Sequence, residues 1–151
     1  MRPEAEPYAA DGGRVGVVLS HGLTGMPGSL RPWAEALAAA GLTVRLPRLP
    51  GHGTRWQDAN KVRWQDWYDE LERAFDDVRS RCDQIFVAGL SMGGTLALRL
   101  AEERGADVSG VVVAEPALRI RGSGAHDVPA DAARFVEVLA DRPGRHRRGG
   151  R

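Results

Sequence analysis

The chain has little cysteine, little lysine and no long hydrophobic run. Its single cysteine, Cys82, excludes a disulfide within the chain and favours a reducing compartment. Residues 1–13 lack the apolar core of a secretion signal, and no apolar run reaches the length of a membrane span. These absences predict a soluble cytoplasmic protein without an integral membrane segment.

An excess of charge of one sign is also missing, because 21 Lys and Arg residues are balanced by 20 Asp and Glu residues. This balance gives no electrostatic reason to expect a nucleic-acid partner. Only the end of the chain departs from it, since residues 142–151 read RPGRHRRGGR. That segment is basic and has nothing apolar to bury, so we expect it to be disordered.

The apolar runs that are present are short and alternate with segments of helical periodicity. Four runs suit strands buried on both faces of a sheet: residues 15–19, 43–46, 85–88 and 111–114. The alternation of strand and helix predicts an α/β fold, a parallel sheet flanked by helices. The 151 residues are enough for one domain with a sizeable core.

The predicted organisation has three parts. An N-terminal segment covers residues 1–13, an α/β core covers residues 14–121, and a divergent tail covers residues 122–151. In the tail, helical spacing predicts one short helix over residues 132–140, before the basic end. If no further strand follows, residues 111–114 form an unpaired hydrophobic edge of the sheet.

One predicted helix carries much of the aromatic content of the chain. Its apolar face contains Trp64, Trp67 and Tyr68, followed by aliphatic and aromatic residues at the same spacing. Large aromatic side chains at helical spacing are far more often packed in a core than stacked on a ligand. We therefore expect these three to pack against the sheet.

Residues 85–100 read IFVAGLSMGGTLALRL, a short apolar run followed by an apolar helix. Between the two stands the pattern G-x-S-x-G, from Gly89 through Ser91 to Gly93. In this context the pattern predicts a nucleophile elbow, a sharp turn that holds a serine in an exposed and strained position. A side chain at either glycine would collide with the neighbouring strand or helix. Ser91 is the predicted nucleophile.

A serine hydroxyl attacks a carbonyl group effectively only with a base and with donors for the oxyanion that forms. The backbone N–H of Met92, at the start of the helix, is one candidate donor. The loop after the first strand, residues 21–25, is placed to provide the second.

Four motifs, SHGLTG, LPGHG, GLSMGG and VVVAEPAL, follow or end the four strands in this order. Together they resemble the α/β-hydrolase superfamily and, within it, small bacterial carboxylesterases related to monoacylglycerol lipases. The likeness spans roughly residues 13 to 120. It implies hydrolysis of small-molecule carboxylic esters through an acyl-enzyme on Ser91, with the N–H groups of Leu23 and Met92 as the oxyanion hole. It implies neither a metal nor an organic cofactor.

The acid and the base of such enzymes follow the nucleophile, usually after two further strands. About sixty residues follow Ser91, and they show no such strands. His146 lies among arginines, with nothing apolar to hold its imidazole near Ser91. His126 falls where the lid of the family begins, and Glu115, at a strand end, would still need a histidine. We expect a partial α/β-hydrolase fold that lacks the C-terminal strands.

Two other histidines, His21 and His52, precede the serine and belong to the HG and GHG turns. In the family the catalytic acid and base follow the serine in the chain, so this order favours a structural role for both histidines. We predict that each fixes its loop by hydrogen bonds.

Three functional hypotheses stay open at this point. The first is an ester hydrolase cut short near Gly122, where the family pattern ends and Arg- and Gly-rich sequence follows, as a shifted reading frame would give. The second is an acyltransferase or thioesterase, which shares the elbow. The third is a non-catalytic binding module whose basic tail contacts acidic partners, although no aromatic residues are interleaved for base stacking. Nothing in the sequence indicates the oligomeric state.

Overall fold

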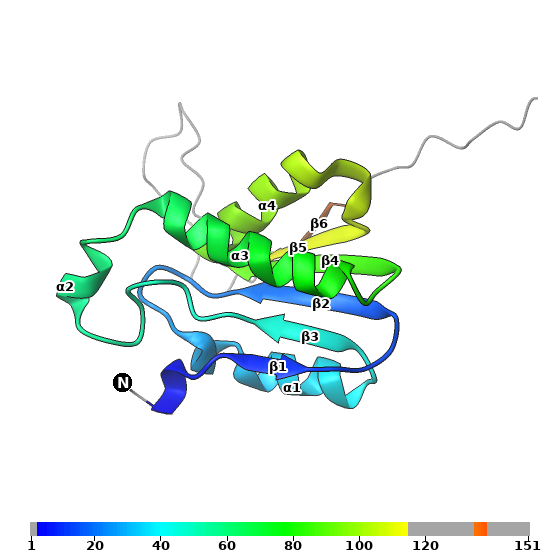
Figure 1. Cartoon of the computed structure of the whole chain (residues 1–151), viewed down its shortest axis with the longest axis horizontal. Helices are drawn as coiled ribbons and strands as arrows, with labels where there is room; N and C mark the ends of the chain where they lie inside the picture. Colours follow the sequence, from blue (N-terminus) through cyan, green and yellow to red (C-terminus); the bar gives the residue numbers. More distant parts are fainter. Residues whose placement is uncertain (1–2, 115–134, 139–151) are drawn as a thin grey trace, which may run out of the picture.

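The structure is a computed structural model that describes residues 3–114, the Trp56 side chain excepted, and the backbone of residues 135–138. Within these residues six strands form one sheet in the order β1-β3-β2-β4-β5-β6 (Figure 1). In chain order the strands are β1 (Tyr8–Ala10), β2 (Val15–Ser20), β3 (Thr43–Leu46), β4 (Gln84–Leu90), β5 (Gly110–Ala114) and β6 (Phe135–Val138).

The four central strands are those that the apolar runs predict. β2 pairs in parallel with both β3 and β4, and β4 pairs in parallel with β5. The helices are α1 (Arg31–Ala39), α2 (Trp56–Ala59), α3 (Trp64–Arg79) and α4 (Met92–Arg104), with single turns η1 (Pro3–Ala5), η2 (Pro27–Ser29) and η3 (Gly105–Asp107). The predicted α/β fold with a mostly parallel sheet is confirmed.

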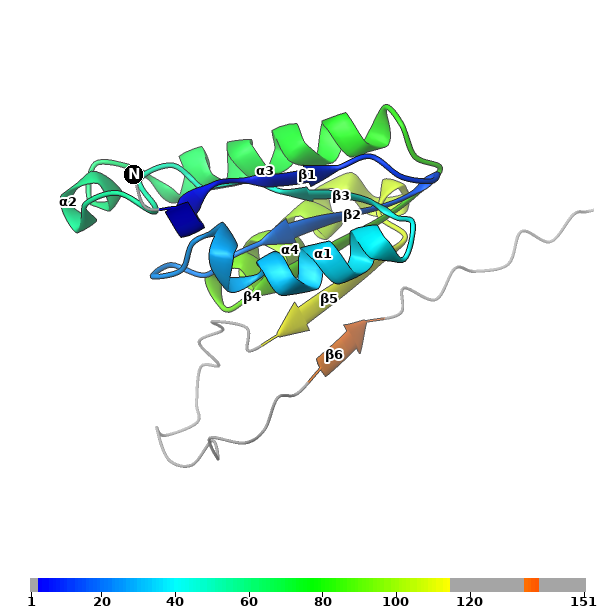
Figure 2. The same cartoon turned by 90° about the horizontal axis from the view of Figure 1, so that it is seen from below.

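Side chains that alternate along the strands build one apolar layer on each face of the sheet. Val17 and Leu19 pack with α1, whereas Val18 packs with α3 and α4 on the opposite face. Figure 2 shows α3 and α1 on opposite sides of the strands. Because both faces are covered, the strands read as continuous apolar runs.

The N-terminus of α3 is capped by a residue of its own first turn. The N–H of Arg63 donates to the carboxylate of Asp66 at 2.7 Å, which satisfies a backbone group ahead of the helix. Tyr68 is buried and Trp67 is partly buried, as predicted. Trp64 differs, since 48% of it is exposed. It is the first residue of the helix, and helical side chains tilt toward the N-terminus, which carries its ring past the end of the core.

Neither edge strand is predicted from the sequence. β1 pairs antiparallel with β3, although residues 1–13 show no strand pattern, because three residues are too few to show alternation. β6 pairs antiparallel with β5, so the prediction of an unpaired edge at residues 111–114 is wrong. The helix predicted over residues 132–140 is also wrong at residues 135–138. Phe and Val favour strands, and the edge of β5 offers unpaired backbone groups.

Among residues 3–114 and 135–138, no helix combines the length and the apolar character needed to cross a lipid bilayer.

Candidate functional site

Ser91 occupies the turn between the last residue of β4 and the first residue of α4. Its backbone has φ 54° and ψ −119°, and no other non-glycine residue in the described part of the chain has a positive φ. Conformations of this kind cost an L-residue about 1–3 kcal/mol and persist only where the surroundings impose them. The strained turn that the G-x-S-x-G pattern predicts is therefore present.

The strain at Ser91 leads to a stability prediction. Ser91→Gly is expected to have a free energy of unfolding about 1–3 kcal/mol higher than Ser91→Ala, because glycine adopts this backbone conformation without a steric penalty. Both variants lack the hydroxyl, so the difference between them reports the relief of backbone strain, less the greater chain entropy of glycine in the unfolded state. Urea unfolding of the two variants measures it. Equal stabilities would mean that Ser91 is not strained.

Two glycines of the elbow allow backbone segments to approach each other closely. A Cβ atom at Gly93 would lie 2.1 Å from the carbonyl oxygen of Ser20, at the end of β2. A Cβ atom at Gly89 would lie 2.2 Å from the carbonyl oxygen of Gly93. The first turn of α4 is thus pressed against the ends of β2 and β4, and the predicted steric reason for both glycines is confirmed.

The loop after β2 runs directly beside Ser91. A Cβ atom at Gly22 would lie 3.5 Å from the Cβ of Ser91, and Leu23 is the next residue. On the other side of the serine, Met92 begins α4, whose first N–H groups have no partner within the helix. The fold thus brings Leu23, Ser91 and Met92 to the same end of the sheet.

His21 is fully buried and both its ring nitrogens are engaged. Nε2 accepts the N–H of Leu49 at 3.2 Å, so the proton is assigned to Nδ1, which donates to the carbonyl oxygen of Gly22 at 3.0 Å. Burial lowers the pKa of His21 to about 4. A neutral ring with no free nitrogen cannot serve as the base for Ser91.

His52 is also buried and lies between two carbonyl oxygens. Its Nε2 is 2.6 Å from the oxygen of Leu23, and its Nδ1 is 3.1 Å from the oxygen of Pro50. The prediction that each fixes its own loop by hydrogen bonds is confirmed for His21. His52 instead bonds to Leu23 in a different loop, with Nδ1 facing the oxygen of Pro50 in its own turn. The other candidates for the acid and the base, Glu115, His126 and His146, lie outside the described residues.

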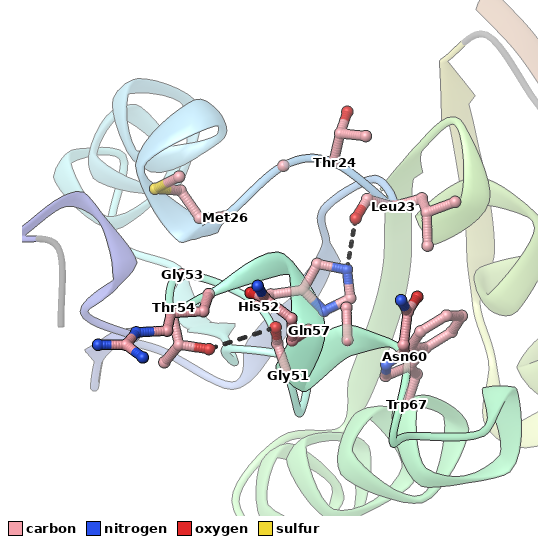
Figure 3. A pocket seen from close by; sticks show the side chains of 13 residues that line it. Leu23, Thr24, Met26, Gly51, His52, Gly53, Thr54, Gln57, Asn60 and Trp67 are labelled. Carbon is pink, nitrogen blue, oxygen red and sulfur yellow. Dashed lines mark hydrogen bonds between the residues drawn. The ribbon is translucent and has the colours of Figure 1, made fainter.

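A cavity of about 670 Å³ opens beside residues 21–25, the loop after β2 that carries Leu23 and is called the oxyanion loop below (Figure 3). Its lining comes from the loop after β2, the loop after β3 with α2, and α3: Leu23, Thr24, Gly25, Met26, Gly51, His52, Gly53, Thr54, Arg55, Gln57, Ala59, Asn60 and Trp67. Leu23 belongs to this lining and Ser91 does not. The cavity therefore adjoins the predicted oxyanion hole at Leu23.

Trp67 is the residue of this region whose role the sequence does not predict. Helical spacing predicts its burial, but its indole N–H also donates to the carbonyl oxygen of Pro50 at 2.9 Å. No local pattern signals such a bond, because the two residues are 17 positions apart. Within the described part of the chain, no three His, Cys, Asp or Glu side chains are grouped so as to hold a metal ion.

The burial of His21 predicts a loss of stability in acid. In the unfolded chain a histidine has a pKa near 6.5, whereas in the folded protein the pKa of His21 is about 4. The unfolded state therefore binds more protons in this range. The stabilisation is complete above pH 6.5 and is lost as the pH falls through 4, by about 3 kcal/mol in all.

Unfolding of the wild type and His21→Asn between pH 7 and pH 4 measures this effect. Asparagine can still donate to Gly22 but does not titrate, so the stability difference between the two proteins should shrink toward pH 4. A difference that does not change with pH would contradict the assignment of His21 as a buried neutral ring.

Comparison with known proteins agrees with this fold. The chain matches the Hydrolase_4 family, described as serine aminopeptidase, S33, over residues 13–146. It therefore belongs to this family of α/β-hydrolases, which the motifs at its strand ends indicate.

Two curated relatives from Bacillus are named as a lipase and a carboxylesterase. A thermostable monoacylglycerol lipase of Bacillus sp. (strain H-257) is 49% identical over 129 residues, which cover 85% of this chain and 48% of the relative. A carboxylesterase of Bacillus subtilis (strain 168) is 29% identical over 96 residues, 63% of this chain and 39% of the relative. The chain thus spans about half the length of the curated relatives it matches.

Solved structures show the same relationship. One, from work on LipS and LipT, two metagenome-derived lipolytic enzymes, has a TM-score of 0.76 and 39% identity, over 85% of this chain and 55% of that one. The monoacylglycerol lipase of Paleococcus ferrophilus has a TM-score of 0.59 and 29% identity, over 76% of this chain and 44% of that one. The described residues thus correspond to part of a hydrolase domain.

Proposed function

We propose that this protein hydrolyses carboxylic esters through an acyl-enzyme on Ser91, with the N–H groups of Leu23 and Met92 as the oxyanion hole. The observation that carries the proposal is the position of Ser91, strained at the N-terminus of α4 with the backbone of Gly22 against it. The identity to a monoacylglycerol lipase and a carboxylesterase supports an ester as the substrate.

In the proposed reaction the Oγ of Ser91 forms a bond to the acyl carbon of the ester. The negative charge that develops on the carbonyl oxygen is bound by the two N–H groups and by the N-terminal end of α4. The C–O bond to the alcohol then breaks, and the proton from Oγ ends on the leaving alcohol. Water releases the acid in a second step by the same path.

A proton carrier is required in both steps. Both nitrogens of His21 are hydrogen-bonded, and both nitrogens of His52 face backbone carbonyl oxygens, so neither ring offers a nitrogen to Ser91. We therefore propose that the carrier comes from outside the described residues.

A comparison of leaving groups tests the substrate class. The chain is incubated with a butyryl ester, a butyryl thioester and a butyryl anilide, with Ser91→Ala measured in parallel. We expect the ester to be hydrolysed faster than the thioester and the anilide, and only by the chain that keeps Ser91. Preferred turnover of the thioester would favour a thioesterase instead, and equal turnover by Ser91→Ala would reject the proposal.

A further inference from the structure

His52 is bonded to the loop of the predicted oxyanion hole, although it lies on a different segment of the chain. Its Nε2 is 2.6 Å from the carbonyl oxygen of Leu23, 29 residues earlier (Figure 3). Only 5% of His52 is exposed. The bond is therefore short, and its donor ring is buried.

The two peptide groups on either side of the Leu23 Cα atom are held by different imidazoles. The Gly22–Leu23 peptide, which carries the N–H of Leu23, accepts a hydrogen bond from His21 at the oxygen of Gly22. The Leu23–Thr24 peptide accepts the bond from His52 at the oxygen of Leu23. Because a trans peptide is planar, with its C=O and N–H opposed, the bond from His21 sets the direction of the Leu23 N–H. The bond from His52 holds the other end of the same residue, so that the Leu23 Cα atom is fixed between two bonded peptides.

The side chain of Leu23 does little to hold this direction. It is 52% exposed, so packing does not anchor the residue in a core. The loop outside the sheet is held instead by backbone bonds, which include a turn from the N–H of Gly25 to the oxygen of Gly22 at 3.0 Å. Apart from that turn, the hydrogen bond from His52 is the one that holds Leu23 itself among the described residues.

His52 is itself held in place from two sides. Its ring contacts the rings of His21 and Trp67 edge to face, with centroids 5.0 Å and 5.4 Å away. The indole N–H of Trp67 bonds to the oxygen of Pro50, which also lies against Nδ1 of His52. A continuous set of contacts therefore runs from α3 through the GHG turn to the oxyanion loop.

The hydrogen-bond partners of His52 also decide which of its ring nitrogens carries the proton. Both ring nitrogens face carbonyl oxygens, which can only accept. The contact with Leu23 is the shorter, at 2.6 Å against 3.1 Å, and the oxygen of Pro50 already accepts from Trp67, so the proton of a neutral ring is assigned to Nε2. His52 therefore acts toward this loop as a donor.

From these contacts we propose that His52 is a positioning residue of the oxyanion hole. Its Nε2–H bond to the carbonyl oxygen of Leu23 holds that residue in place, so that the Leu23 N–H, whose direction His21 sets, stays at the oxygen of the reacting carbonyl. The proposal rests on the proposed function of Ser91 and Leu23. A donor displaced by about 1 Å can cost up to about 100-fold in rate, so the bond should matter for reactivity more than for folding.

A matched pair of variants separates the effect of the hydrogen-bond donor at Nε2 from the effect of the imidazole ring. In His52→Gln the amide nitrogen can reach the position of Nε2, whereas in His52→Asn it reaches only the position of Nδ1. Each variant and the wild type are titrated with a fluorophosphonate, and the rate constant of modification at Ser91 is measured apart from the affinity for the reagent. Hydrogen exchange of residues 21–27 and thermal unfolding are followed on the same samples.

We expect His52→Asn to react with Ser91 about 10- to 100-fold more slowly than the wild type, at unchanged affinity. Residues 21–27 should exchange faster in this variant, while β2 and β4 exchange as before. His52→Gln should restore most of the rate and most of the protection.

Equal rates and equal exchange in His52→Asn and the wild type would overturn the proposal. So would equal losses in both variants together with a fall in melting temperature, since the ring would then matter only for packing. If the wild type itself is not modified at Ser91, the proposed function fails. In that case the exchange of residues 21–27 in the two variants still decides whether His52 holds the loop.

Discussion

Gly93→Ala is expected to lower the free energy of unfolding by about 3 kcal/mol or more. The added Cβ would lie 2.1 Å from the oxygen of Ser20 and 2.5 Å from the oxygen of His21. Both are backbone atoms at the end of a central strand, so no side chain can rotate away to make room. Either α4 or β2 must shift, and a shift in a packed core is costly.

Chemical unfolding followed by tryptophan fluorescence measures this loss. Gly22→Ala is the control, because its Cβ would meet only the Leu90 oxygen at 3.4 Å and the Ser91 Cβ at 3.5 Å, which are ordinary contacts. We expect the control to stay within about 1 kcal/mol of the wild type. If Gly93→Ala is as stable as Gly22→Ala, the first turn of α4 does not press on the end of β2.

Ser91→Ala is expected to lower the kcat/KM for a butyryl ester by at least about 100-fold. The reason is chemical, since the methyl group cannot form the acyl-enzyme. The backbone of alanine meets the same strain as that of serine, so the free energy of unfolding should change little.

Ser109→Ala provides a matched control for the loss of a serine hydroxyl. The Oγ of Ser109 accepts the N–H of Ile85 near the start of β4, whereas Ser91 follows the end of that strand. This variant should keep the wild-type kcat/KM. A fall in Ser109→Ala equal to that in Ser91→Ala would show that the assay reports folding rather than the nucleophile.

The features predictable from the sequence are those that a local pattern encodes. The central strands are buried on both faces and are therefore continuous apolar runs. The elbow needs glycines at fixed positions around Ser91, for steric reasons that hold wherever this turn occurs. The places of Leu23 and Met92 follow from the same motifs, because they adjoin a strand end and a helix start, and their role as oxyanion donors stays a prediction.

The edge strands and one aromatic side chain are not predictable in this way. β1 has three residues and β6 has four, too few to distinguish alternation from helical spacing. Their pairing depends on the free edges of β3 and β5, which are set by the whole sheet. Trp64 follows the helical period of α3 but lies at its first position, beyond the core.

The hydrogen bonds that support the candidate site also cannot be predicted from a local sequence pattern. The sequence predicts that His52 fixes its own turn, but the partner it reaches is a backbone oxygen in another loop. Every residue type carries that oxygen, so no signature marks Leu23 as the acceptor. The bond between Trp67 and Pro50 is hidden for the same reason.

The central claim is that Ser91 is a reactive nucleophile, and labelling by a fluorophosphonate tests it most directly. The 151-residue chain is incubated with the reagent, its intact mass is measured, and the modified peptide is located by mass spectrometry. We predict one adduct, on Ser91, and none on Ser91→Ala. An unmodified wild-type chain, or an adduct that persists in Ser91→Ala, would contradict the claim.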